Sequence, residues 1–128
     1  MFSYAAIGFD LAGSVVSILV NEGQMVEQGQ LLAEVDDQRL VAKMSELSAI
    51  LNRAKSEQNL AELSLKRVTD LVDKKLESVQ RLDESTESVN AANAFVNEVL
   101  ARKKSLQVEI DKTKLLAPFD GNIVSRLV

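Results

Sequence analysis

Two of the side chains that enzymes use most often in catalysis and in metal binding are absent from this sequence. Its 128 residues include no cysteine and no histidine, which removes disulfides, thiolate chemistry, most zinc sites and the commonest general base. The acidic residues Asp83, Glu84 and Glu87 are expected to lie on solvated helix faces, and the sequence shows no paired carboxylates, metal cluster or nucleophile arrangement. We therefore expect a protein that is not an enzyme and that holds no cofactor or metal.

Composition narrows the class of protein further. A hydrophobic content of 46% and a charged content of 27% are typical of a chain that folds. The net charge is -4 and no basic cluster is present, which argues against a nucleic-acid partner. No apolar run approaches the ~18 residues that a membrane-spanning helix needs. The first residues do not show a charged segment followed by an apolar one, the pattern of an export signal.

The elements that must position any binding residue are mostly helical. Residues 30–117 contain neither glycine nor proline, which predicts long helices. Two runs in this stretch place apolar residues at steps of three and four, as in a heptad repeat. We call the two runs together the seam: Leu40, Met44, Leu47, Leu51, Ala54, Gln58, Ala61, Leu65, Val68 and Val72, then Leu82, Ser85, Val89, Ala92, Val96, Val99, Lys103, Leu106 and Ile110.

The two runs predict an antiparallel helical hairpin. A polar stretch, residues 73–78, separates them, and so short a connection between long helices makes them antiparallel. The arms should cover residues 37–73 and 78–113, each ~50 Å long. The polar seam residues Gln58 and Lys103 are expected to set the register or to extend their polar ends to solvent.

Short strands flank the predicted hairpin. Residues 13–20 read GSVVSILV and residues 121–128 read GNIVSRLV, identical at five of eight positions. Glycines after polar residues predict tight turns between the early strands, and Pro118 with Asp120-Gly121 predicts a turn after the second arm. We interpret the two copies as halves of one quasi-symmetric β domain of α+β class, split by the hairpin. The first half of the β domain would be residues 1–36, the hairpin residues 37–113, and the start of the second half residues 114–128. The second half would be truncated, because we expect the chain to be a fragment of a longer protein.

Nearly the whole chain resembles a known family. The stretch AGSVVSILVNEGQMVEQGQLLAEVD, the hairpin, and then LLAPFDGNIVSRLV together resemble the membrane fusion proteins of HlyD type, also called periplasmic adaptor subunits. The resemblance implies a lipoyl-like (barrel-sandwich hybrid) domain interrupted by a coiled-coil hairpin. It also implies a periplasmic location, with the full-length protein anchored to the inner membrane.

The resemblance extends to the hairpin tip. Adaptors that dock a TolC-like outer-membrane channel carry an Arg, a Leu four residues on and a Ser seven residues later, and Arg67, Leu71 and Ser78 match this spacing. Arg67 and Leu71 also share a helix face outside the seam, so we expect an exposed apolar side chain beside a cation. Their structural alternatives are a solvated charge for Arg67, packing on Leu76 for Leu71 and a helix N-cap for Ser78.

By the same resemblance, the full-length protein would form a ring, often of six copies, between an inner-membrane transporter of RND or ABC type and the channel. Arm length favours a drug-efflux adaptor over an adaptor for type I protein secretion. A biotinyl or lipoyl carrier would need its modified lysine on a tight turn near residues 35–37, and Lys43 lies beyond that turn, beside seam residue Met44. An unrelated coiled-coil spacer would leave the repeated strands unexplained.

Overall fold

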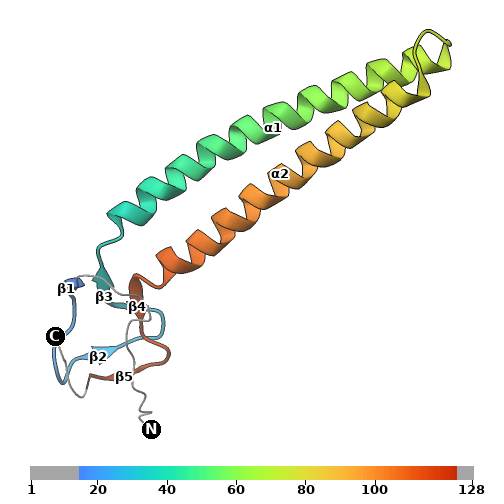
Figure 1. Cartoon of the computed structure of the whole chain (residues 1–128). Helices are drawn as coiled ribbons and strands as arrows, with labels where there is room; N and C mark the ends of the chain where they lie inside the picture. The colour runs from blue at the N-terminus through green and yellow to red at the C-terminus, as the bar shows by residue number, and fades with distance from the viewer. Residues whose placement is uncertain (1–14, 124–128) are drawn as a thin grey trace. The chain divides into compact units, whose positions relative to one another are not determined.

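The computed structural model describes residues 15–123. Five strands and two helices follow in the order β1 (Val15–Ile18), β2 (Met25–Val26), β3 (Leu31–Val35), α1 (Gln38–Asp73), α2 (Val79–Asp111), β4 (Lys114–Leu116) and β5 (Gly121–Asn122). Figure 1 shows the two helices side by side and joined at one end. The chain divides into two compact units: a β unit, up to Ala42 and from Leu106 on, and a hairpin unit of residues 43–105.

Strands from before and after the hairpin form the β unit together. β3 is the middle strand of an antiparallel sheet with the order β1-β3-β4, and β2 pairs with β5 in a second, two-stranded sheet. Ala33 of β3 lies opposite Leu115 of β4, and Val26 of β2 lies opposite Gly121 of β5. The pairing confirms that the hairpin leaves one part of a β domain and returns to the other.

A small apolar core holds the β unit. Four buried residues form it, with Leu115 and Ile123 packed against them: Val20, Val26, Leu32 and Ala117. Gly23 and Gly29 adopt φ angles of 81° and 85°, so the predicted turns require the left-handed region that glycine enters freely. The amide of Gly29 donates to the carbonyl of Ala117 at 2.8 Å, so this turn also joins the two parts of the chain.

The repeated segments do not pair with each other where the structure describes them. β1, from the first copy, pairs with β3, whereas β5, from the second copy, pairs with β2. The two copies therefore lie in different sheets, and the simplest form of our interpretation, in which they pair with each other, is wrong for the described residues. They still belong to one β unit, because Val20 of the first copy is in the small core against which Ile123 of the second copy packs. Residues 124–128, most of the second copy, lie outside the described part of the chain, as do Gly13 and Ser14 of the first copy.

The helices begin and end close to the predicted bounds of the arms. α1 starts just after Asp36, whose Oδ1 accepts a hydrogen bond from the amide of Gln38 at 3.0 Å, a capping interaction for the free amides of a first turn. It continues to Asp73 and α2 covers Val79–Asp111. Among the described residues, neither helix has an apolar stretch sufficient to cross a membrane.

The seam is the contact surface between the two helices. Every predicted seam residue is buried or half-buried, which confirms the heptad interpretation. Its middle is a buried cluster of Leu51, Ala54, Val96 and Val99. Gln58 Nε2 donates to Asn93 Oδ1 at 2.7 Å, so this polar seam residue bonds across the helices and favours a single register.

Candidate functional site

The hairpin tip, residues 73–78, closes with a defined hydrogen-bond pattern. The amide of Leu76 donates to the carbonyl of Leu71 at 2.8 Å, and the amide of Lys75 donates to the carbonyl of Val72 at 2.9 Å. Lys75 has a φ of 60°. These two bonds around a left-handed residue make a Schellman motif, which satisfies carbonyls that the end of a helix leaves free.

This motif changes the role expected for Leu71. Leu71 is half-buried, not exposed, so the sequence-based expectation of an exposed leucine is wrong in degree. In a Schellman motif the residues at the positions of Leu71 and Leu76 often pack on each other. The bond between their backbones thus supports the structural alternative for Leu71, in which its side chain contributes to closing the turn.

Ser78 is the N-cap of α2, as predicted. Its Oγ accepts a hydrogen bond from the amide of Arg81 at 3.1 Å, and its carbonyl accepts one from the amide of Leu82 at 3.3 Å. The hydroxyl still has a proton to donate. Ser78 is exposed, so its side chain can cap the helix and donate to a partner at the same time.

Arg67 lies one helical turn before Leu71. Its side chain is exposed, and among residues 15–123 the three side-chain ion pairs join Arg53 to Glu57, Arg81 to Glu84 and Arg102 to Glu98. The five donors of the Arg67 guanidinium are therefore available to an external acceptor. The structure brings Leu71 and Ser78 to one connection and places Arg67 beside it, as the motif predicts.

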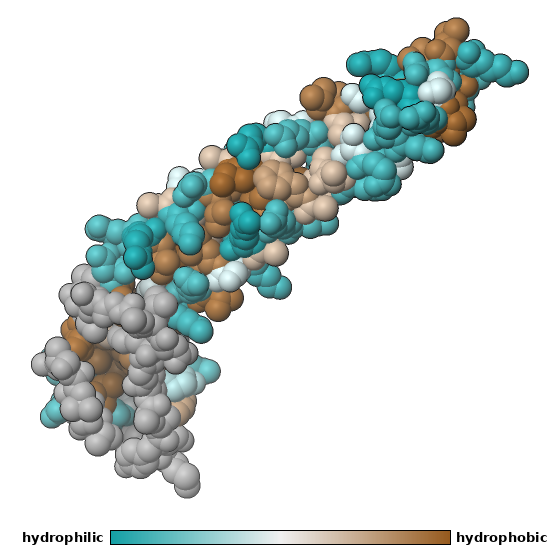
Figure 2. All heavy atoms as spheres, viewed as in Figure 1, coloured by the Kyte–Doolittle hydropathy of each residue, from teal (hydrophilic) through white to brown (hydrophobic). Residues whose placement is uncertain are grey.

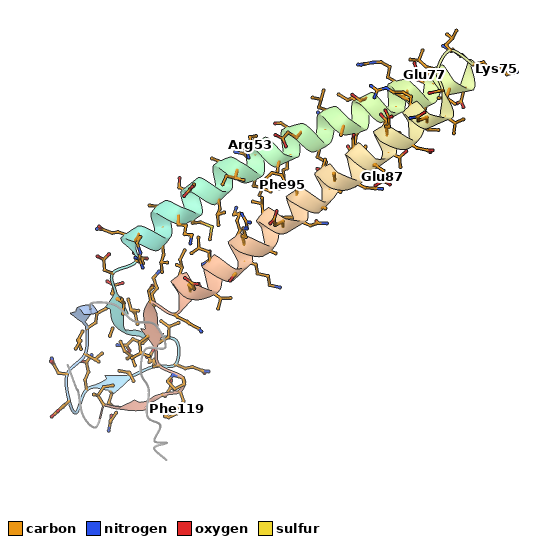
Figure 3. The ribbon with its side chains drawn as sticks, in the orientation of Figure 1. Arg53, Lys75, Glu77, Glu87, Phe95 and Phe119 are labelled. Atoms are coloured by element: carbon orange, nitrogen blue, oxygen red, sulfur yellow. The ribbon has the colours of Figure 1, made fainter. Side chains whose placement is uncertain are left out.

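The sequence analysis did not predict two exposed apolar residues at the tip. Leu76 is 68% exposed and Val79, the first residue of α2, is 64% exposed. Both lie outside the two seam runs, and that was the available signal. Figure 2 shows hydrophobic side chains at this end of the hairpin unit, and Figure 3 shows Lys75 and Glu77 there. The tip therefore presents apolar surface between charged groups.

The lysine that a carrier domain would require lies in a different setting. Lys43 is exposed in α1, five residues after the helix begins at Gln38. After β3 the chain enters this helix directly, so Lys43 does not lie on a tight turn between strands.

Comparison with known proteins agrees with the fold and confirms the family resemblance seen in the sequence. The model of the RND membrane fusion protein (MFP) family for the barrel-sandwich hybrid domain matches residues 4–128. The macrolide export protein MacA of Yersinia pestis is 31% identical, over 92% of this chain and 36% of that protein. The multidrug resistance protein MdtA of Pectobacterium carotovorum is 30% identical, over 87% of this chain and 27% of that protein. The chain thus spans about a third of these relatives.

Solved structures share the fold at low sequence identity. The membrane fusion protein Spr0693 of Streptococcus pneumoniae has a TM-score of 0.79 at 18% identity, covering 99% of this chain and 52% of that one. ZneB of Cupriavidus metallidurans has a TM-score of 0.65 at 18% identity, covering 96% and 53%. Both align along almost the whole of this chain, helices and strands included.

Proposed function

Because this chain belongs to the family of RND membrane fusion proteins, we propose that it forms the hairpin-bearing part of a periplasmic adaptor for drug efflux. The adaptor would link an inner-membrane transporter of RND or ABC type to a TolC-like outer-membrane channel, without catalysis of its own. The names of the relatives MacA and MdtA, a macrolide export protein and a multidrug resistance protein, support drug efflux over the alternative of type I protein secretion.

The hairpin suits a mechanical role. α1 and α2 have 36 and 33 residues, and no glycine or proline interrupts either. The seam residues on their inner faces are buried or half-buried, so the groups available for binding lie on the flanks and the tip of the hairpin. In this proposal the adaptor positions and seals the channel, and the transporter supplies the energy.

The single observation that carries channel docking is the exposed guanidinium of Arg67 beside the tip, which forms no ion pair with any of residues 15–123. Arg67 would donate to carboxylates or carbonyls of the channel, and the Ser78 hydroxyl would donate a further hydrogen bond. Leu71 would contribute the part of its side chain that stays exposed. The rest of its side chain is unavailable to a partner, because Leu71 is half-buried.

Self-association into a ring, with six copies as the expected number, belongs to the same proposal. Leu60 and Leu63 of α1 are 65% and 52% exposed, and neither belongs to the seam. Burying the part of these side chains that is still exposed against a neighbouring copy would be favourable by about 1 to 2 kcal/mol each. We also propose the domain division 1–36, 37–113 and 114–128, and inner-membrane anchoring of the full-length protein.

The docking proposal is tested by Arg67→Asp in the full-length protein. Since Arg67 is exposed and has no ion pair within residues 15–123, we expect unchanged helicity and melting but loss of drug export and of channel binding. Export is measured as drug resistance of cells, and binding with the purified channel. Leu71 is left intact, because replacing a half-buried residue would confuse docking with folding.

Lys66→Asp is the matched control, because it makes the same charge change on the adjacent residue, whose side chain points about 100° away around the helix. Lys66 is exposed as well, so this variant should export normally. Normal export by Arg67→Asp would contradict the docking role of Arg67, and a loss of melting temperature in that variant would show that the residue is structural.

A further inference from the structure

Lys75 occupies a backbone position that favours glycine. Its φ is 60°, and the other two positive φ angles among residues 15–123 belong to Gly23 and Gly29. A side chain in the left-handed region is strained, because its Cβ crowds the backbone. The position after a helix that ends in a Schellman motif is most often glycine for this reason. The chain thus keeps a lysine where glycine would be more stable.

The surroundings of Lys75 do not explain its presence by folding. Its side chain is exposed, and it has no ion pair with another described residue. Residues 73–78 contain two acidic residues, Asp73 and Glu77, and two basic residues, Lys74 and Lys75. The net charge of the loop is therefore zero, and its charge alone would not attract an anionic partner. The backbone of Lys75 closes the turn through its bond to Val72, which a glycine could also make, so a strained residue whose side chain forms no ion pair with the described residues points to a role in binding.

Lys75 is next to exposed apolar surface. Leu76 and Val79, 68% and 64% exposed, follow it within four residues, and we call Lys75, Leu76 and Val79 the tip patch. The patch lies beyond Val72 and Leu82, the last seam residues of the two helices. A copy packed alongside would cover helix flanks such as Leu60 and Leu63, whereas covering the tip patch requires a partner at the end of the hairpin.

We propose that the tip patch is a second contact with the outer-membrane channel. Leu76 and Val79 enter an apolar recess of the channel, and the Lys75 ammonium pairs with a carboxylate at the edge of that recess. This inference rests on the proposed function and names groups that the Arg67, Leu71 and Ser78 motif does not include. The proposal also explains why a lysine is kept in a left-handed conformation, because its side chain would bind a partner and not stabilise the fold.

Lys75→Gly separates the two roles of this residue, because stability and binding should change in opposite directions. Relief of strain should raise the melting temperature by about 4 °C. Loss of the ammonium group should weaken binding of the full-length adaptor to a purified TolC-type channel in detergent by about tenfold. Lys75→Arg should bind as wild type with an unchanged melting temperature.

Two further variants test the location and chemistry of the patch. Leu76→Ser with Val79→Ser should also weaken channel binding by about tenfold, whereas Leu100→Ser, at an apolar residue of α2 that is 44% exposed, should not. Lys74→Ala removes the same charge from a neighbour outside the left-handed region. A loss as large as that of Lys75→Gly would mean that only the loop charge matters, and would overturn the inference.

The outcomes distinguish this inference from the proposed function. If wild type binds the channel and Arg67→Asp does not, but Lys75→Gly binds normally, the tip patch is wrong and the adaptor function stands. If wild type fails to bind any TolC-type channel, the proposed function fails first. If the tip variants reduce self-association and leave channel binding intact, the partner of the tip patch is a second copy and the inference is overturned. The inference is also overturned if Lys75→Gly does not raise the melting temperature.

Discussion

At the connection between the helices, single residues have distinct roles because backbone groups there lack helical partners. Ser78 caps α2 through Arg81, and Lys75 allows the chain to turn after α1. Leu71 shows how one residue can serve two needs, since its carbonyl accepts the Leu76 amide while part of its side chain stays accessible. Recognition and folding therefore share side chains within this short segment.

Ser78→Ala should destabilise the protein by about 1 kcal/mol, because the Arg81 amide loses its capping acceptor. Urea unfolding followed by circular dichroism measures this loss. Ser78→Asp is the control, because aspartate caps equally well and its charge is favourable at a helix N-terminus. Restored stability with export still impaired would identify the hydroxyl as a docking group, whereas unchanged stability in Ser78→Ala would contradict the capping role.

At the scale of elements, the seam decides whether the hairpin exists. Apolar residues at heptad spacing cover the inner faces, and the Gln58–Asn93 hydrogen bond adds a polar contact that one register alone can form. Isolated helices of this kind gain most of their stability from packing. The two arms therefore depend on each other for stability, and a substitution on the seam should destabilise both helices.

Leu51→Asp should unfold the hairpin, because it places a charge without a partner in the buried cluster with Ala54, Val96 and Val99. Leu51 is 7% exposed, so we expect a loss of at least about 3 kcal/mol and a collapse of the helical signal at moderate temperature. Leu60→Asp makes the same substitution at an exposed position of the same helix and should melt nearly as wild type. Equal melting of the two variants would show that the assigned register is wrong.

At the scale of the whole molecule, segments far apart in the sequence close the β unit. β3 pairs with β4, and β2 pairs with β5, although the whole hairpin separates the strands of each pair in the sequence. The Gln28 amide donates to Asp120 Oδ1 at 2.6 Å, a bond between residues 92 positions apart. These contacts return the chain after α2 to strands that precede α1.

Asp120→Ala should loosen this closure, because the Gln28 amide loses a charged acceptor. We expect a cost of about 1 kcal/mol and faster hydrogen exchange of the Gln28 amide. Asp111→Ala is the control: Asp111 Oδ1 accepts a local bond from Gln107, four residues away within α2. Unchanged exchange at Gln28 in Asp120→Ala would show that the bond does not hold the β unit together.

Local patterns were enough to predict the helices, the turns and the Ser78 cap. These patterns are heptad spacing, the absence of glycine and proline from residues 30–117, and a serine before an apolar run. Each pattern determines the structure of residues close to it in the sequence. That is why the seam from Leu40 to Val72 could be read residue by residue. The exposed Leu76 and Val79 left a weaker signal, because apolar residues in a short connection can equally pack within it.

The folded chain decided the rest, for reasons that depend on distant contacts. β1 and β5 come from similar segments, yet each pairs with a different strand, because strand pairing follows from which edges meet in space. Leu71 is half-buried at a turn whose left-handed residue is Lys75, and helical spacing carries no information about that turn. The amino-acid order thus specified the rod and its buried face, and the partners of the strands and the surface of the tip emerged from three-dimensional packing.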